Sequence, residues 1–149
     1  MILSVALLLI VAFIWGNSVL SPTVSEKISR AVGGFLSGVV GTGDETVTVG
    51  GLSVRKAGHF FEFFALGVVS WLLAGAWFTN KPLKALVTAL MGISVPLIDE
   101  TVQIFSGRGH SVKDVWIDIA GFSVGVGVVL LVSAVALAIG DSCKNKHKK

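Results

Sequence analysis

The stretch LIDETVQIFSGRGHSVKDVWIDIAG, Leu97 to Gly121, decides how the chain is interpreted, because it gathers polar residues inside a strongly apolar sequence. On its two sides, the runs Leu83 to Pro96 and Phe122 to Ile139 carry one charged side chain between them, Lys84. Ionisable groups at the depth of a bilayer are costly to insert and commonly mark a functional site. The alternative is that the preceding helix leaves the membrane near Pro96, so that these acids lie in water.

The composition is that of a membrane protein. Of the 149 residues, 53% are apolar and 14% are charged, and the mean hydropathy is +0.84. Apolar segments of about 20 residues cross a bilayer as helices. The sequence therefore predicts an all-α membrane protein of one domain with four transmembrane helices. Their expected positions are about 1–18, 54–78, 82–105 and 112–139, with an outer loop at 19–53 and a basic tail at 140–149.

The net charge of +3 comes largely from four lysines in the tail, residues 144–149. A short basic tail beside a spanning segment is typical of contact with an anionic cytoplasmic leaflet, and no nucleic-acid partner is expected. The single cysteine, Cys143, excludes an internal disulfide. No lysine or arginine precedes the first apolar run, which favours a retained helix over a cleaved signal peptide.

Basic residues near helix ends predict the orientation. The combined number of lysines and arginines would be the same on both sides of the membrane, so this count alone does not decide the orientation. Lys81, Lys84 and the tail lysines lie close to helix ends, where the positive-inside rule acts most strongly. We therefore expect both termini in the cytoplasm and the polar stretch at the outer face.

The segment between the first two helices carries two weaker patterns. From Thr23 to Val40, apolar residues recur at spacings of three and four, which indicates a short amphipathic helix on the outer surface. Gly41 to Gly51 alternates threonine and valine between glycines, which is compatible with a small hairpin or an irregular loop.

The second predicted helix has one polar face. Ser53 is a suitable N-cap, and Arg55, His59 and Glu62 follow at spacings of four and three, which place them on one side. Phenylalanines fill the rest of the circumference, so the polar side should face partner helices. The short turn at 79–82, with Pro82 in the first turn of the next helix, predicts antiparallel neighbours.

Polar residues also cluster where the third helix ends and the fourth begins. Asp99, Glu100 and Gln103 form one sector of the third helix, just after Pro96, which is expected to kink it. Ser111 and Asp114 have the spacing of a capping box. Asp118 follows one turn later, and Gly121 and Gly125 continue that side as a seam of small residues for close packing.

Glu62, Asp99 and Asp118 lie at similar depth, about 10 Å below the outer helix ends at roughly 1.5 Å per residue. Isolated buried carboxylates are expensive, so we expect a shared cavity open to the outer face. The groups expected to meet in it are Glu62, Asp99, Glu100, Asp118, His59, Arg55 and Arg108.

Several of these residues also have simpler interpretations. The capping-box spacing already accounts for Asp114. For Gln103, the simpler interpretation is a hydrogen bond between helices. The pair His59 and Glu62 fits a structural hydrogen bond better than a metal pair. Arg108 either neutralises the acids or grips a phosphate or carboxylate.

Three runs resemble the VanZ-like family of small bacterial membrane proteins. They are VRKAGHFFEFFALG (Val54 to Gly67), IDETVQIFSGRGHSVKDVWIDIAG (Ile98 to Gly121) and, more weakly, NSVLS (Asn17 to Ser21). The resemblance implies a multi-pass protein of the bacterial plasma membrane, in a family whose best-known member confers low-level resistance to the lipoglycopeptide teicoplanin. Gly58 stands where the family often has alanine, and Phe63 where tyrosine is common.

The resemblance and the polar pattern together define the candidate site. The candidate catalytic residues are His59, Glu62, Asp99, Glu100 and Asp118, and the candidate substrate-binding residues are Arg55, Lys56, Gln103, Arg108 and Asp114. The expected partners are membrane lipids, a lipid-linked envelope precursor or a glycopeptide.

Four mechanisms stay open from sequence. In an acid-base enzyme acting on a lipid-linked substrate, Glu62 or Asp99 is the general base, His59 shuttles the proton and Arg108 orients an anionic headgroup. In a metal-dependent enzyme, His59, Glu62, Asp99 and Asp118 hold a divalent cation, although no metal ligand is assigned from spacing alone. The same cluster would also serve a non-catalytic binding module or, in an oligomer, a proton-coupled transporter.

Overall fold

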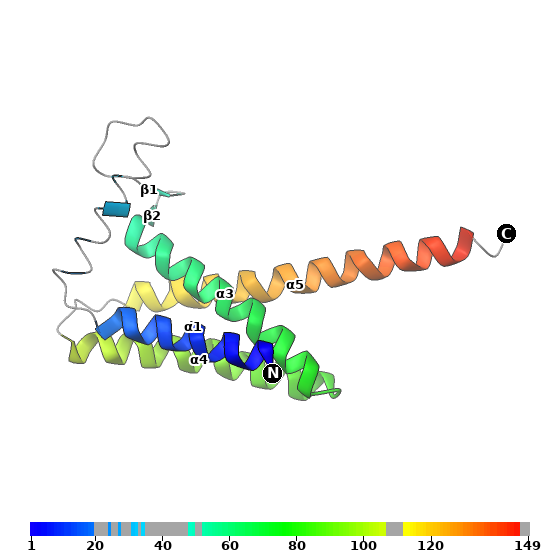
Figure 1. Ribbon diagram of the computed structural model, residues 1–149, viewed down its shortest axis with the longest axis horizontal. Coiled ribbons are helices and arrows are strands. Elements are labelled where there is room, and N and C mark those ends of the chain that lie inside the picture. Colours follow the sequence, from blue (N-terminus) through cyan, green and yellow to red (C-terminus); the bar gives the residue numbers. More distant parts are fainter. Residues whose placement is uncertain are drawn as a thin grey trace.

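Four long helices make up the protein in a computed structural model, which describes residues 1–19, 24, 27, 31–32, 34, 48–49, 52–106 and 112–146. They are α1 (Ile2–Val19), α3 (Val54–Trp77), α4 (Lys81–Phe105) and α5 (Val112–Lys146) (Figure 1). Each is long and apolar enough to cross a membrane. The predicted all-α architecture with four membrane-spanning helices is therefore confirmed.

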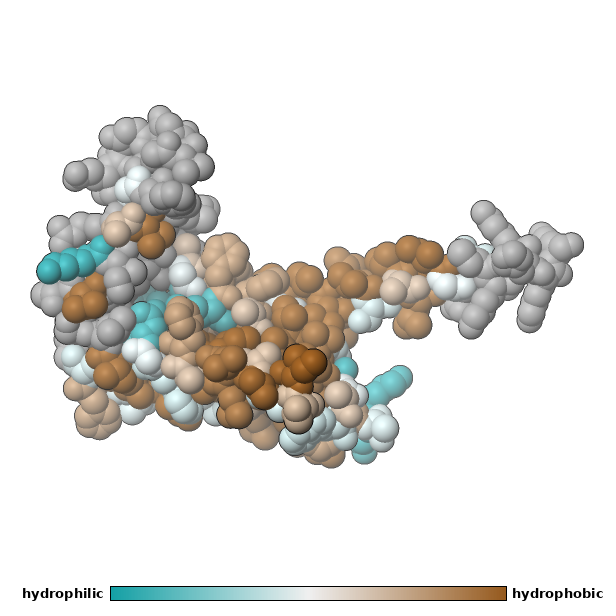
Figure 2. Space-filling model, in the orientation of Figure 1, coloured by the Kyte–Doolittle hydropathy of each residue, from teal (hydrophilic) through white to brown (hydrophobic). Residues whose placement is uncertain are grey.

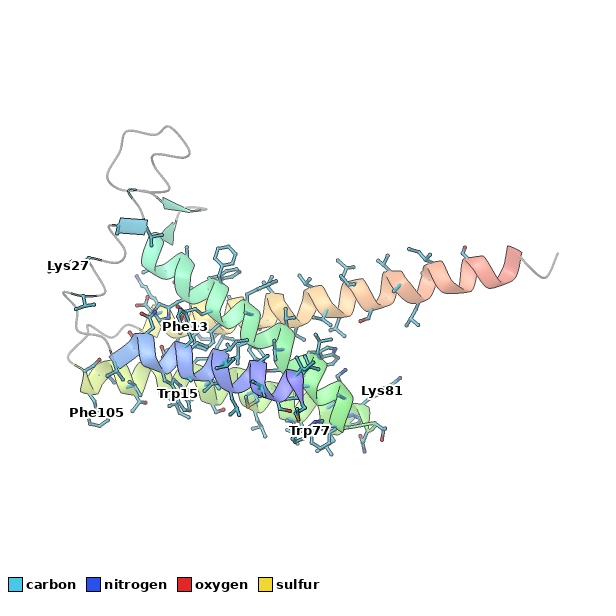
Figure 3. The ribbon with its side chains drawn as sticks, viewed as in Figure 1. Phe13, Trp15, Lys27, Trp77, Lys81 and Phe105 are labelled. Atoms are coloured by element: carbon cyan, nitrogen blue, oxygen red, sulfur yellow. The ribbon has the colours of Figure 1, made fainter. Side chains whose placement is uncertain are left out.

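The helices alternate in direction, so one end of the bundle collects the residues that the sequence singles out. This end, which we call the site end, holds the last turns of α1 and α4 and the first turns of α3 and α5. Trp77 and Lys81 lie at the opposite end, far from Phe105 (Figure 3). Hydrophilic residues gather at both ends, with an apolar region between them (Figure 2).

The start of α4 shows how local sequence fixes a helix boundary. The side chain of Asn80 accepts a hydrogen bond of 3.3 Å from the main-chain N–H of Leu83, and Pro82 occupies the first turn. Both features suit a helix N-terminus. The three residues between α3 and α4 make the two helices antiparallel neighbours, as predicted. Pro96 lies inside α4, which continues to Phe105.

The expected end of the fourth helix is wrong. We predicted a helix to residue 139 followed by a tail, whereas α5 is helical through Lys146. The residues after Ile139 include no proline, and Lys144 and Lys146 lie near the helix C-terminus, where positive charge is favourable. The basic segment therefore extends the helix.

Most of the segment 20–51 lies outside the described residues, and so does most of the amphipathic helix expected at 23–40. Near the end of this segment, β1 (Thr48–Val49) pairs antiparallel with β2 (Leu52–Ser53), which lies just after it. This short pairing agrees with the hairpin alternative for the glycine-rich loop. It ends directly at the first residue of α3.

The most extensive helix contact is between α3 and α5, and glycines permit it. A Cβ atom at Gly121 would overlap the main-chain oxygen of Phe60, and one at Gly125 would overlap that of Phe64. One at Gly67 would in turn overlap the main-chain oxygen of Phe122. The predicted seam of small residues is thus confirmed, with α3 as its partner.

A compact apolar core lies beside this seam. It consists of Ile14, Phe63, Leu66, Val95 and Phe122, which come from all four helices. The later half of α5 diverges from the other helices (Figure 1). Its large apolar side chains are exposed at Leu130, Leu131, Val132, Val135, Leu137 and Ile139, as expected of a surface that meets lipid.

Candidate functional site

Asp99 is the centre of the polar cluster and is fully buried. Its Oδ1 atom accepts a hydrogen bond of 2.6 Å from the Ser18 hydroxyl on α1, and its Oδ2 atom accepts one of 2.7 Å from Nε2 of Gln103. The hydroxyl of Ser106 donates to the main-chain oxygen of Ser18 at 3.0 Å. These bonds join the ends of α1 and α4 and hold the carboxyl group of Asp99 in one orientation.

His59, Asp99 and Asp118 form what we call the His–Asp–Asp cluster. The Nδ1 atom of His59 lies 3.7 Å from Oδ1 of Asp118 and 4.0 Å from Oδ2 of Asp99. All three residues are buried, and one potential ligand atom from each lies within 4.8 Å of the others. Of the three acids that matched depth placed together, Asp99 and Asp118 meet here, and the residue of α3 beside them is His59, which was among the groups expected in the same cavity.

Glu62 extends the cluster toward α1. Its Oε1 atom accepts a hydrogen bond of 3.1 Å from Nδ2 of Asn17. A groove of about 700 Å³ lies between α1 and α3. It is lined by Leu9, Ile10, Phe13, Gly58, Phe61, Ala65 and Glu62. A carboxyl group thus lies in the wall of an otherwise apolar groove.

The remaining described candidates surround this centre. Nζ of Lys56 lies 3.5 Å from Oδ1 of Asp114, so an ion pair joins the first turns of α3 and α5. Glu100 is buried beside Asp99 on α4. Nε2 of Gln103 donates within its own helix, to Asp99 four positions earlier, whereas the sequence suggested a hydrogen bond between helices.

The side chain of Arg55 and the residues Arg108 and Ser111 lie outside the described residues. The participation of both arginines in the cluster, and its opening to the outer face, stay predictions. The assignment of catalytic and substrate-binding roles to the ten candidate residues is likewise a prediction.

Sequence reasoning missed two members of the site, Asn17 and Ser18. Both are polar residues in the last turn of an otherwise apolar helix, and neither was among the candidate site residues. Ser18 is fully buried and directly contacts Asp99. Their position within the weaker run of the family resemblance was the available signal.

The glycine seam positions the His–Asp–Asp cluster. His59 immediately precedes Phe60, whose main chain touches Gly121, and Asp118 lies three residues before that glycine. The separation of α3 and α5 at this level is therefore set by main-chain contact. Because that contact cannot adjust by side-chain rotation, the His59 and Asp118 side chains are held close together.

No curated protein and no solved structure matches the sequence. The VanZ/LLP1 family profile, in contrast, matches residues 3–133. This range includes residues of all four spanning helices and every described residue of the site. The chain is therefore a multi-pass membrane protein that belongs to the VanZ/LLP1 family.

Proposed function

We propose that this protein binds an envelope amphiphile, with the acyl chain in the groove between α1 and α3 and the headgroup at Glu62 and the His–Asp–Asp cluster. The observation that carries the proposal is the groove itself, in which six apolar residues lead to one carboxyl group. A site for a wholly polar ligand would not need such a wall. A lipid or a lipid-linked envelope precursor has both required parts.

The described polar groups favour a headgroup rich in hydrogen-bond donors. Glu62, Asp99, Glu100 and Asp118 all offer acceptor oxygens. Sugar hydroxyls and ammonium groups complement such a site better than a bare phosphate does. The acyl-bearing glycopeptide teicoplanin has this chemistry as well, which is how a binding protein of this kind would contribute to tolerance of the drug.

A hydrolase or transferase acting on the same amphiphile is the second candidate. It is favoured by the position of His59, whose Nδ1 atom lies at 3.7 and 4.0 Å from two carboxylate oxygens. An imidazole flanked by carboxylates is suited to move a proton. In that case Glu62, at the groove wall, is the general base nearest to the bound headgroup.

Filling the groove is expected to remove the bound amphiphile. Ala65→Trp places a large ring among the groove residues, so the acyl chain of the lipid loses its apolar contacts there. Native mass spectrometry of the detergent-purified protein should show the lipid adduct reduced by about tenfold or more. Ala76→Trp is the matched control, since Ala76 lies on the same helix, is exposed and does not line the groove.

The same variants test whether the drug phenotype depends on the groove. In a susceptible host, Ala65→Trp should lose any tolerance to teicoplanin that the wild type confers, while sensitivity to a glycopeptide without an acyl chain stays unchanged. An undiminished lipid adduct in Ala65→Trp, at normal protein abundance, would contradict a binding role for the groove.

The orientation of the protein in the bacterial plasma membrane is testable by labelling. We expect the termini and Lys81 in the cytoplasm, because the lysines at the end opposite the site lie close to helix ends. In a Cys143→Ser background, Gly109→Cys should react with an impermeant thiol reagent on intact cells, and Lys81→Cys should react only after lysis. The reverse pattern would place the site end in the cytoplasm.

A further inference from the structure

We propose that His59, Asp99 and Asp118 bind a divalent transition-metal ion. The three residues project from α3, α4 and α5 and offer one imidazole nitrogen and two carboxylate oxygens. Their ligand atoms lie within 4.8 Å of one another, with two of the separations at 3.7 and 4.0 Å. Ligands on one zinc ion at about 2.1 Å are roughly 3.4 Å apart, so small side-chain shifts complete the site.

Asp118 is the group that points to a ligand. It is 1% exposed, and its Oδ1 atom has no hydrogen-bond partner in the described part of the chain. Among the described side chains, the cationic candidate beside it is His59, whose Nδ1 atom lies at 3.7 Å, too distant for a hydrogen bond. A buried carboxylate oxygen without a donor is costly, and a cation between Asp118 and His59 removes that cost.

The balance of charge favours a cation over a further anion. Among the described side chains of the site, five are carboxyl groups: Glu62, Asp99, Glu100, Asp114 and Asp118. Lys56 forms an ion pair with one of these carboxyl groups, that of Asp114, at the outer edge of the site. Within the described residues, the His–Asp–Asp cluster holds two carboxyl groups and one imidazole, a set that a divalent ion would neutralise.

Asp99 is already oriented as a metal ligand would be. Ser18 and Gln103 donate to its two oxygens at 2.6 and 2.7 Å, and each oxygen retains capacity for another contact. Hydrogen bonds of this kind typically orient a ligating carboxylate from outside the metal. The bond from Ser18 also explains why α1 is tied to a site whose ligands come from the other three helices.

The donor set restricts the ion. A site of imidazole and carboxylates suits Zn²⁺ or Mn²⁺, whereas Ca²⁺ and Mg²⁺ prefer oxygen ligands alone. Three protein ligands also leave coordination positions for water or a ligand group. Metal binding is measured without any amphiphile, so the proposal stands or falls independently of the proposed function.

Metal titration of the purified protein tests the site. The wild type, purified without a histidine tag and treated with a chelator, should bind one Zn²⁺ or Mn²⁺ per chain in isothermal titration calorimetry. His59→Gln and Asp118→Asn should each weaken that binding more than about tenfold. Ser123→Ala is the matched control: Ser123 lies on the same helix, is exposed, and its hydroxyl donates to the main-chain oxygen of Ile119, so this variant should bind the ion as the wild type does.

A spectroscopic measurement on protein with unaltered site residues tests the proposal even if the variants of those residues fail to fold. With Mn²⁺ bound, electron spin-echo spectroscopy should detect a directly coordinated histidine nitrogen. That signal should persist when the other two histidines, His110 and His147, are both replaced by glutamine. Absence of stoichiometric binding by the wild type, absence of the nitrogen coupling, or equal binding by folded His59→Gln and Asp118→Asn would each overturn the proposal.

Discussion

The Gly121→Val variant is expected to lose about 3 kcal/mol or more of folding stability, because its side chain has no room between α3 and α5. A single Cβ atom at Gly121 already overlaps the main-chain oxygen of Phe60. A neighbouring side chain could rotate away, but a helix backbone cannot. The two helices must separate, and His59 then moves away from Asp118.

Gly127→Val provides the control for this prediction. Gly127 lies on the same helix, is exposed, and has no atom within 4 Å of where its Cβ would be. Helix propensity and added apolar volume are thus changed equally in both variants. Thermal unfolding in detergent should show a large drop for Gly121→Val and little change for Gly127→Val. Equal midpoints would mean that the α3–α5 contact is looser than the structure indicates.

The Asp99→Ala variant is expected to cost about 2–6 kcal/mol, because each buried donor left unsatisfied costs about 1–3 kcal/mol. Ser18 and Gln103 both donate to Asp99, and the substitution leaves both donors buried. The cost of unsatisfied buried donors exceeds the relief from removing one buried charge. Because Ser18 belongs to α1, the end of that helix should also detach.

Hydrogen exchange would locate this effect. The last turn of α1 should exchange faster in Asp99→Ala, while the α3–α5 contact stays protected. Thr101→Ala is the matched control on α4, because Thr101 is exposed and its hydroxyl donates to Leu97 of its own helix. Protection of the α1 end equal to that of the wild type would show that the Ser18 bond does not hold the helix.

Much of the fold was predictable from the sequence because the physical signal is simple. Long apolar segments must form helices in a bilayer, since their backbone groups have no other partners there. Apart from the C-terminal end of α5, this argument located the ends of the four helices to within about one residue. It failed at the end of α5, because hydropathy marks where a helix leaves lipid and does not mark where it stops.

The site was partly predictable for a different reason. Matched depth placed Glu62, Asp99 and Asp118 together, because an isolated carboxyl group is costly in an apolar environment. Asp99 and Asp118 do meet, and their partner from α3 is His59, which the sequence placed on the same helix face as Glu62. The same argument says nothing about serine and asparagine, which cost little to place at a helix end. The contact of Ser18 with Asp99 depends on how α1 packs against α4, and helical periodicity within each segment does not encode that pairing.

The spanning segments have unequal lengths, 18 residues in α1 and 28 in α5. At about 1.5 Å per residue they rise roughly 27 and 42 Å, against a hydrocarbon core of about 30 Å. Thus α1 fits nearly upright, whereas α5 fits only when inclined, in keeping with its divergence from α1 in Figure 1. His59 and Asp118 face each other where α3 and α5 meet. The geometry of the site should therefore depend on the thickness of the bilayer. A thinner membrane would incline α5 further, and a thicker one would bring it upright.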